Sequence, residues 1–239
     1  MRTHSTIPLH SRFSMSKQDI NAALGIIGIY SLGVFLTWYP SAVLKIPMPE
    51  NIVLQSATNI VWQTVCTIVM PYIWVMYRLG FTLADLGLSR VNLGRTTLLG
   101  CLLYSLGLAA FIYCSDSYMV ANHALGTLPL PEAMGILAVM AIGVAGTDLA
   151  TRGFILLSMA RYTHVSIAII AQNLVWYLGH IHEIKLLTGC LGYSGALGLT
   201  LTLGIVGDVI ALRTRNVLGL AFAHVILNVG MAIYIRLLM

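Results

Sequence analysis

Polar residues that can carry acid–base chemistry recur at a spacing of four in the second half of the chain. Asp148 precedes Arg152 by four residues, and His224 precedes Asn228 by four. Residues four apart lie on the same face of an α-helix, so each pair points in one direction. Asp148 and Arg152 are expected to form an ion pair, because two unpaired charges inside an apolar helix are strongly unfavourable.

A third polar position, His180, follows Trp176 by four residues and lies between the two pairs. Histidine accepts or donates a proton near neutral pH. Asparagine and a second histidine can donate hydrogen bonds to a developing oxyanion, and a carboxylate can activate water. Since these residues fall on three neighbouring segments, we predict one catalytic site made of Asp148, Arg152, His180, His224 and Asn228.

These residues are embedded in long apolar runs. Of the 239 residues, 58% are hydrophobic and only 9% are charged, and the mean hydropathy is +0.87. Ordinary soluble domains have about 25% charged residues, so a soluble protein is excluded. The 13 Lys and Arg residues are dispersed along the chain rather than clustered, which excludes a nucleic-acid-binding protein despite the net charge of +5.

The apolar runs predict the fold class. A transmembrane helix needs about 20 apolar residues. The sequence therefore predicts an all-α, polytopic membrane helix bundle of about seven transmembrane helices, near residues 21–44, 52–77, 95–115, 132–160, 165–181, 189–212 and 216–238. We divide it into a polar cytoplasmic tail (1–20), N-terminal membrane helices (21–129) and C-terminal helices that carry the polar motifs (130–239).

The distribution of basic residues predicts the orientation in the membrane. Basic residues favour cytoplasmic loops. Nine of them fall in the tail and in alternate connections, namely Arg2, Arg12, Lys17, Arg78, Arg90, Arg95, Arg161, Arg213 and Arg215, and three fall on the other side, namely Lys45, Lys185 and Arg236. We therefore expect a cytoplasmic N-terminus in a plasma (inner) membrane of the bacterial type.

The cysteines and a possible metal site carry weaker signals. Cys66, Cys101, Cys114 and Cys190 form no CxxC or CxxH spacing and lie in or beside apolar runs, so we expect them to be small buried apolar residues.

His180, His224 and Asp148 could in principle hold a divalent metal such as zinc. No HExxH motif supports that site, and the sequence leaves the cofactor open.

The order and spacing of the three motifs resemble the CAAX-protease and bacteriocin-processing (CPBP, or Abi) family of intramembrane endopeptidases. The family motifs are EExxxR(G), FxxxH and HxxxN/D, each on a separate membrane helix. The corresponding segments here are Thr147-Asp148-x-x-x-Arg152-Gly153-Phe154, Trp176-x-x-x-His180 and His224-x-x-x-Asn228. The resemblance covers about residues 130–232.

This resemblance implies a role for each matching residue. His180 would polarise the attacking water, His224 and Asn228 would stabilise the oxyanion, and Arg152 would orient the acid of the first motif. The chain departs from the family where Thr147 replaces the leading glutamate, since a threonine cannot act as a carboxylate base. Asp148 lies one residue further on, about 100° around the helix, and is the expected partner of Arg152.

Two functions follow from the resemblance and its departure. The first is an intramembrane endopeptidase that cleaves a membrane-proximal peptide by water activation. The alternative is a catalytically degenerate relative that serves as a membrane scaffold or as the partner subunit of another membrane protein. A small transporter or proton channel built around Asp148, Asp208 and the histidines is a third hypothesis, which the lack of internal repeats disfavours. In each case the lipid bilayer is the surrounding partner.

Overall fold

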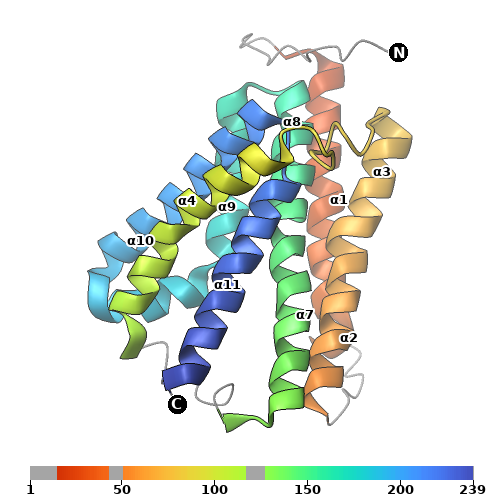
Figure 1. Ribbon diagram of the computed structural model, residues 1–239. Helices are drawn as coiled ribbons and strands as arrows, with labels where there is room; N and C mark the ends of the chain where they lie inside the picture. The colour runs from red at the N-terminus through yellow and green to blue at the C-terminus, as the bar shows by residue number, and fades with distance from the viewer. Residues whose placement is uncertain (1–14, 43–50, 117–126, 239) are drawn as a thin grey trace.

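The computed structural model describes residues 15–42, 51–116 and 127–238, and the regular structure in these ranges is helical (Figure 1). The elements in chain order are α1 (Lys17–Ala42), α2 (Ile52–Thr64), the π-helical segment η1 (Val65–Val69), α3 (Met70–Leu79), α4 (Leu93–Tyr113), α7 (Leu130–Asp148), the π-helical segment η2 (Leu149–Leu156), α8 (Leu157–Tyr162), α9 (Val165–Gly179), α10 (Ile181–Thr214) and α11 (Leu218–Leu238). The predicted tail (1–20) falls mostly outside the described residues. Helix α1 begins at Lys17, so the last residues assigned to the tail belong to the first helix.

The helices are long and apolar enough to cross a membrane, as the sequence predicted. Six candidate spans occur in the described ranges, namely Lys17–Trp38, Ile52–Leu79, Leu93–Tyr113, Leu130–Tyr162, Ile181–Thr214 and Leu218–Leu238, and α9 adds a shorter apolar helix. Aromatic residues near span ends, such as Trp38, Tyr77 and Tyr113, are exposed, which is typical of the membrane–water boundary. The prediction of an all-α polytopic membrane bundle is confirmed.

Several basic connections meet at one end of the bundle. The Asn216 side chain, in the turn between α10 and α11, donates hydrogen bonds to the carbonyl oxygens of Ser89 (2.6 Å) and Val91 (2.8 Å). At the end of α8, the Arg161 guanidinium lies 4.7 Å from the ring centroid of Phe81. The connections after α3, α8 and α10 are therefore adjacent, at the end of the bundle where α1 begins (Figure 1).

The opposite end of the bundle differs from the prediction in two ways. The segment after His180 is helical instead of a loop, and α10 runs from Ile181 with an interruption at Gly192, whose φ of +67° suits glycine. Cys190, just before that interruption, forms a disulfide with Cys114 at the end of α4, with their Cα atoms 5.8 Å apart.

The expectation that the cysteines serve only as small buried apolar residues is therefore wrong for this pair, whereas Cys66 and Cys101 are free thiols. The pairing left no local spacing signal because 76 residues separate the two cysteines. It depends on the fold, which brings the start of α10 against the end of α4.

Candidate active site

Arg152 is the centre of a buried polar network that joins helices from both halves of the chain. Its side chain is fully buried on η2. All five of its N–H groups have acceptors, which are Asp208 Oδ1 (3.2 Å), Tyr104 Oη (3.0 Å), the Asp148 carboxylate, and the carbonyl oxygens of Leu203 (3.1 Å) and Gly204 (3.3 Å). The guanidinium carbon also lies 4.2 Å from the ring centroid of Trp176.

Glycines on α10 make room for this guanidinium. A Cβ atom at Gly207 would collide with Arg152, and one at Gly204 would collide with the side-chain oxygen of Asn173. The backbone of α10 can therefore approach η2 and α9 closely. Asn173, on α9, donates a 2.7 Å hydrogen bond to Oδ2 of Asp208, so both oxygens of that carboxylate have donors.

Asp148 binds two partners at once. Its Oδ1 atom is paired with Arg152, which confirms the ion pair predicted from their spacing, and its Oδ2 atom lies 3.0 Å from Nδ1 of His224. The His224 ring stacks on Tyr104 with 4.7 Å between ring centroids. Asp148 therefore orients an imidazole as well as balancing the charge of Arg152.

His180 lies at the joint between α9 and α10. Its Nδ1 atom is 2.8 Å from the carbonyl oxygen of Trp176, and its ring stacks on the Trp176 indole at 4.0 Å between centroids. If Nδ1–H is the donor in this contact, Nε2 is left as the acceptor. The His180 and His224 ring centroids are 6.2 Å apart, close enough for both side chains to reach one bound carbonyl or water.

The remaining motif positions are bonded within their own helices. The Asn228 amide nitrogen donates to the carbonyl oxygen of His224 at 3.0 Å. The Thr147 hydroxyl donates to the carbonyl oxygen of Gly143 at 3.1 Å. The structure thus brings Asp148, Arg152, His180 and His224 together, with Asn228 one turn beyond His224.

Asp148, His180 and His224, the residues considered above for a divalent metal, do not form a metal-binding cluster in the structure. No group of three His, Cys, Asp or Glu residues in the described ranges is arranged to hold a metal ion. The reason at this site is visible in Asp148, whose two oxygens already bind Arg152 and His224.

Three residues of the network were not predicted as part of the site: Asp208, Asn173 and Tyr104. Asp208 has Arg213 five residues further along the chain, but the structure pairs it with Arg152 on another helix. The sequence does indicate that Asp208 has a partner, because a carboxylate in an apolar run needs a cation or a hydrogen-bond donor. Which partner it finds depends on how the helices pack.

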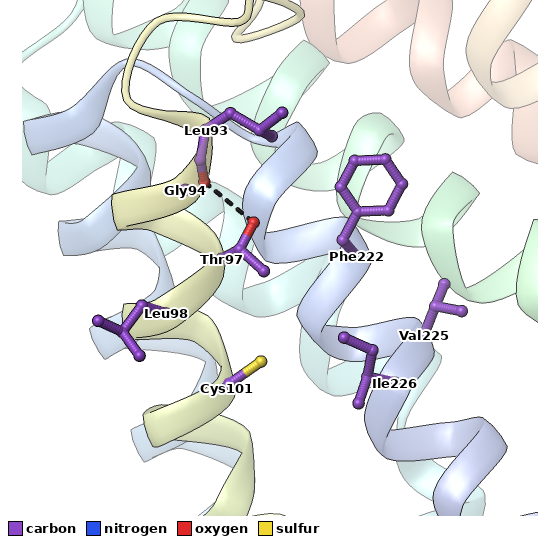
Figure 2. A pocket seen from close by; sticks show the side chains of 8 residues that line it. All are labelled: Leu93, Gly94, Thr97, Leu98, Cys101, Phe222, Val225 and Ile226. Atoms are coloured by element: carbon purple, nitrogen blue, oxygen red, sulfur yellow. Dashed lines mark hydrogen bonds between the residues drawn. The ribbon is translucent and has the colours of Figure 1, made fainter.

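A shallow apolar groove lies beside the network, between α4 and α11 (Figure 2). It has a volume of about 690 Å³ and is lined by side chains such as Leu98, Cys101 and Phe222. The Thr97 hydroxyl is satisfied by the carbonyl oxygen of Leu93 at 2.9 Å. None of the predicted site residues lines this groove, so it is separate from the histidine pair.

Comparison with known proteins agrees with the motif analysis. Residues 129–230 match the family model for Rce1-like proteins, described as type II CAAX prenyl endopeptidase Rce1-like. The matched range contains all three motifs and confirms the resemblance predicted from them. No curated protein and no solved structure matches the chain.

Proposed function

We propose that this integral membrane protein, whose residues 129–230 match the Rce1-like CAAX prenyl endopeptidase model, is an endopeptidase that hydrolyses a membrane-proximal peptide. The observation that carries the proposal is the pair of imidazoles 6.2 Å apart, one of them fixed by Asp148 and both packed near Trp176. A peptide carbonyl between the two rings would meet a water-polarising group on one side and a hydrogen-bond donor on the other.

Each site residue has a distinct role in this reaction. His180 polarises the attacking water through Nε2, because Nδ1 is occupied by the Trp176 carbonyl. His224 stabilises the oxyanion. Its Nδ1 atom is bonded to Asp148, so Nε2 is the ring nitrogen left to donate to the oxyanion. Asn228 is the second donor once its amide turns away from the His224 carbonyl.

Arg152 and Asp148 act through their neighbours. Arg152 joins α4, α7 and α10 by its five hydrogen bonds, and so fixes the carboxylate that orients His224. Such buried networks are most favourable when every member is satisfied, and the guanidinium here meets that condition. We assign the C-terminal helices (130–239) to the site and the helices of 21–129 to its support.

The proposed orientation places the basic end of the bundle in the cytoplasm of a bacterial-type cell. Two observations at opposite ends support it. The connections that hold Arg90, Arg161 and Arg215 meet at one end, and the Cys114–Cys190 disulfide lies toward the other. Disulfides persist on the oxidising side of a membrane, whereas basic residues favour the cytoplasmic side.

The proposal is tested with the purified full-length protein in liposomes. The probe is a synthetic peptide that ends in a prenylated CAAX sequence, chosen from the chemistry that the family description names. Mass spectrometry should detect a shortened N-terminal fragment whose new carboxyl group carries one oxygen from labelled water. An intact probe after prolonged incubation, at several peptide lengths, would argue against an endopeptidase of this class.

One observation favours a second function, that of a membrane scaffold or partner subunit. Thr147 provides a hydroxyl bonded to Gly143 where the family has a glutamate, and the neighbouring Asp148 carboxylate is fully occupied. A site without a base could still bind a peptide carbonyl. Purification in mild detergent distinguishes the two, since a scaffold would co-purify with a stoichiometric membrane-protein partner.

A further inference from the structure

Glu183 has a buried carboxylate oxygen that the motifs do not explain. It lies in the first turn of α10, three residues after His180. Its Oε2 atom is buried and has no hydrogen-bond partner in the described part of the chain. Its negative charge interacts with the His180 imidazole. The carboxylate thus lies within one helical turn of the histidine along the chain, and one of its oxygens is short of a donor.

The face of α10 on which Glu183 lies explains why this acidic side chain is partly buried. Residues three and four apart share a helix face, so Glu183 lies on the same face as Leu187, and Leu187 shares a face with Ile184. Ile184 and Leu187 are 3% and 6% exposed, and they pack in a cluster with Phe111 of α4. Glu183 therefore belongs to the side of α10 that faces the bundle. The positive end of the helix dipole favours its charge there.

The other carboxylates of the network have no free oxygen. Both oxygens of Asp148 are bound, by Arg152 and His224, and both oxygens of Asp208 are bound, by Arg152 and Asn173. At Glu183, by contrast, a buried acceptor lacks a donor, which is unfavourable until a donor arrives. His180 presents a second acceptor, Nε2, because its Nδ1 atom is held by Trp176. A water molecule can donate one O–H to each.

We infer that Glu183 is a catalytic residue which, together with His180, holds and deprotonates the attacking water and so replaces the carboxylate missing at Thr147. This inference rests on the proposed endopeptidase function. The base of the first motif has moved to the turn that follows the histidine of the second motif. The site then keeps the family's pairing of a carboxylate with a histidine, although the carboxylate comes from another helix.

The proton balance of the step is simple. Glu183 takes a proton from the water while the water oxygen bonds to the scissile carbonyl carbon, and the carbonyl becomes an oxyanion near His224. When the oxyanion collapses, the C–N bond breaks and the proton on Glu183 passes to the leaving nitrogen. Glu183 is again ionised, and the products are a peptide that ends in a carboxylic acid and an amine, which become carboxylate and ammonium when the acid proton passes to the amine. The step requires no further reactant.

The first test compares Glu183→Gln with Glu132→Gln in liposomes with the prenylated CAAX peptide. Glu132, in the first turn of α7, is the matched control because it is a partly exposed glutamate at a helix start outside the network. We expect Glu183→Gln to lower kcat by about 10²–10⁴-fold with little change in KM, the usual effect of losing a general base. Glu183→Asp should retain part of the rate. Wild-type kcat in Glu183→Gln would overturn the inference.

A second test requires no turnover and separates this inference from the proposed function. Protein with ¹⁵N-labelled histidine is compared by NMR, and the His180 signal is identified by its loss in His180→Gln. We expect Glu183→Gln, but not Glu132→Gln, to move the His180 ring signals. If they do not move, Glu183 and His180 do not share a water and the inference is overturned. If they move while wild type leaves the peptide intact, the pairing is supported and the endopeptidase function fails.

Discussion

The Nδ1 atom of His224 lies 3.0 Å from Oδ2 of Asp148, although 76 residues separate them in the chain. The other oxygen of the same carboxylate is paired with Arg152. Asp148 therefore links α7 and η2 to α11. The position of the His224 imidazole depends on a carboxylate that is itself held by Arg152. The predictions below test this arrangement and what it does.

Replacement of Asp148 should destabilise the fold. Asp148→Asn leaves a fully buried guanidinium with one carboxylate partner fewer and weakens the bond to His224. Breaking a buried ion pair by removing one partner costs about 3–5 kcal/mol, so the Tm in detergent should fall clearly. Asp85→Asn, in the turn bonded to Thr82, is the control. Equal melting of both variants would show that the network contributes little.

The close approach of α10 to Arg152 predicts different effects for two glycines on the same helix. At Gly207 a Cβ atom would collide with the guanidinium, whereas at Gly198 it would meet nothing within 4 Å. Gly207→Ala should cost about 1–3 kcal/mol of stability, as overpacking of a tight interior usually does. Gly198→Ala should be neutral or slightly stabilising, because alanine favours helix. Denaturant or thermal unfolding of the two variants measures the difference, and the reverse order would refute this packing.

The sequence predicts the helices well because each carries its own signal. The apolar runs near 52–77 and 216–238 match observed spans within a few residues, since length and hydropathy are local properties. The pairing of Asp148 with Arg152 is equally local, because four residues along a helix fix it. The segment 181–191 is less clear, since its polar start suggested a loop although it forms the beginning of α10.

Contacts between distant segments could not be predicted in the same way. Asp208 had several possible cationic partners, and only the packing of α10 against η2 selects Arg152. The Cys114–Cys190 bond likewise depends on two segments 76 residues apart. Glu183 gave no signal either, because a glutamate in the first turn of a helix is common on helix-dipole grounds alone. Its buried oxygen becomes apparent only in the folded chain.

The proposed orientation predicts which positions an impermeant thiol reagent can reach. After the native cysteines are replaced, single cysteines are introduced at Arg90, Arg213 and Lys185, all of which are exposed. In intact cells the cysteines at 90 and 213 should be protected, and the cysteine at 185 should react. Permeabilised cells provide the control for accessibility. Labelling of position 90 from outside would reverse the proposed topology.

Moving the carboxylate back to its family position should rescue the loss of Glu183. Thr147→Glu alone places a second carboxylate beside Asp148, where like charges repel, so any gain in cleavage is expected to be small. In the Glu183→Gln background, however, Thr147→Glu should restore part of the rate, up to the 10²–10⁴-fold that a positioned base provides. The measurement is the initial rate of peptide cleavage in the single and double variants. A double variant no faster than Glu183→Gln would indicate that position 147 no longer faces the reacting water.

The most direct measurement of the central claim is the cleavage rate of the prenylated CAAX peptide by His180→Ala and by His182→Ala. His180 stacks on Trp176 and faces His224, whereas His182, two residues away, is exposed. The account predicts that wild type and His182→Ala cleave the peptide at similar rates and that His180→Ala loses nearly all activity. Equal rates in all three proteins, or no cleavage by any of them, would contradict it.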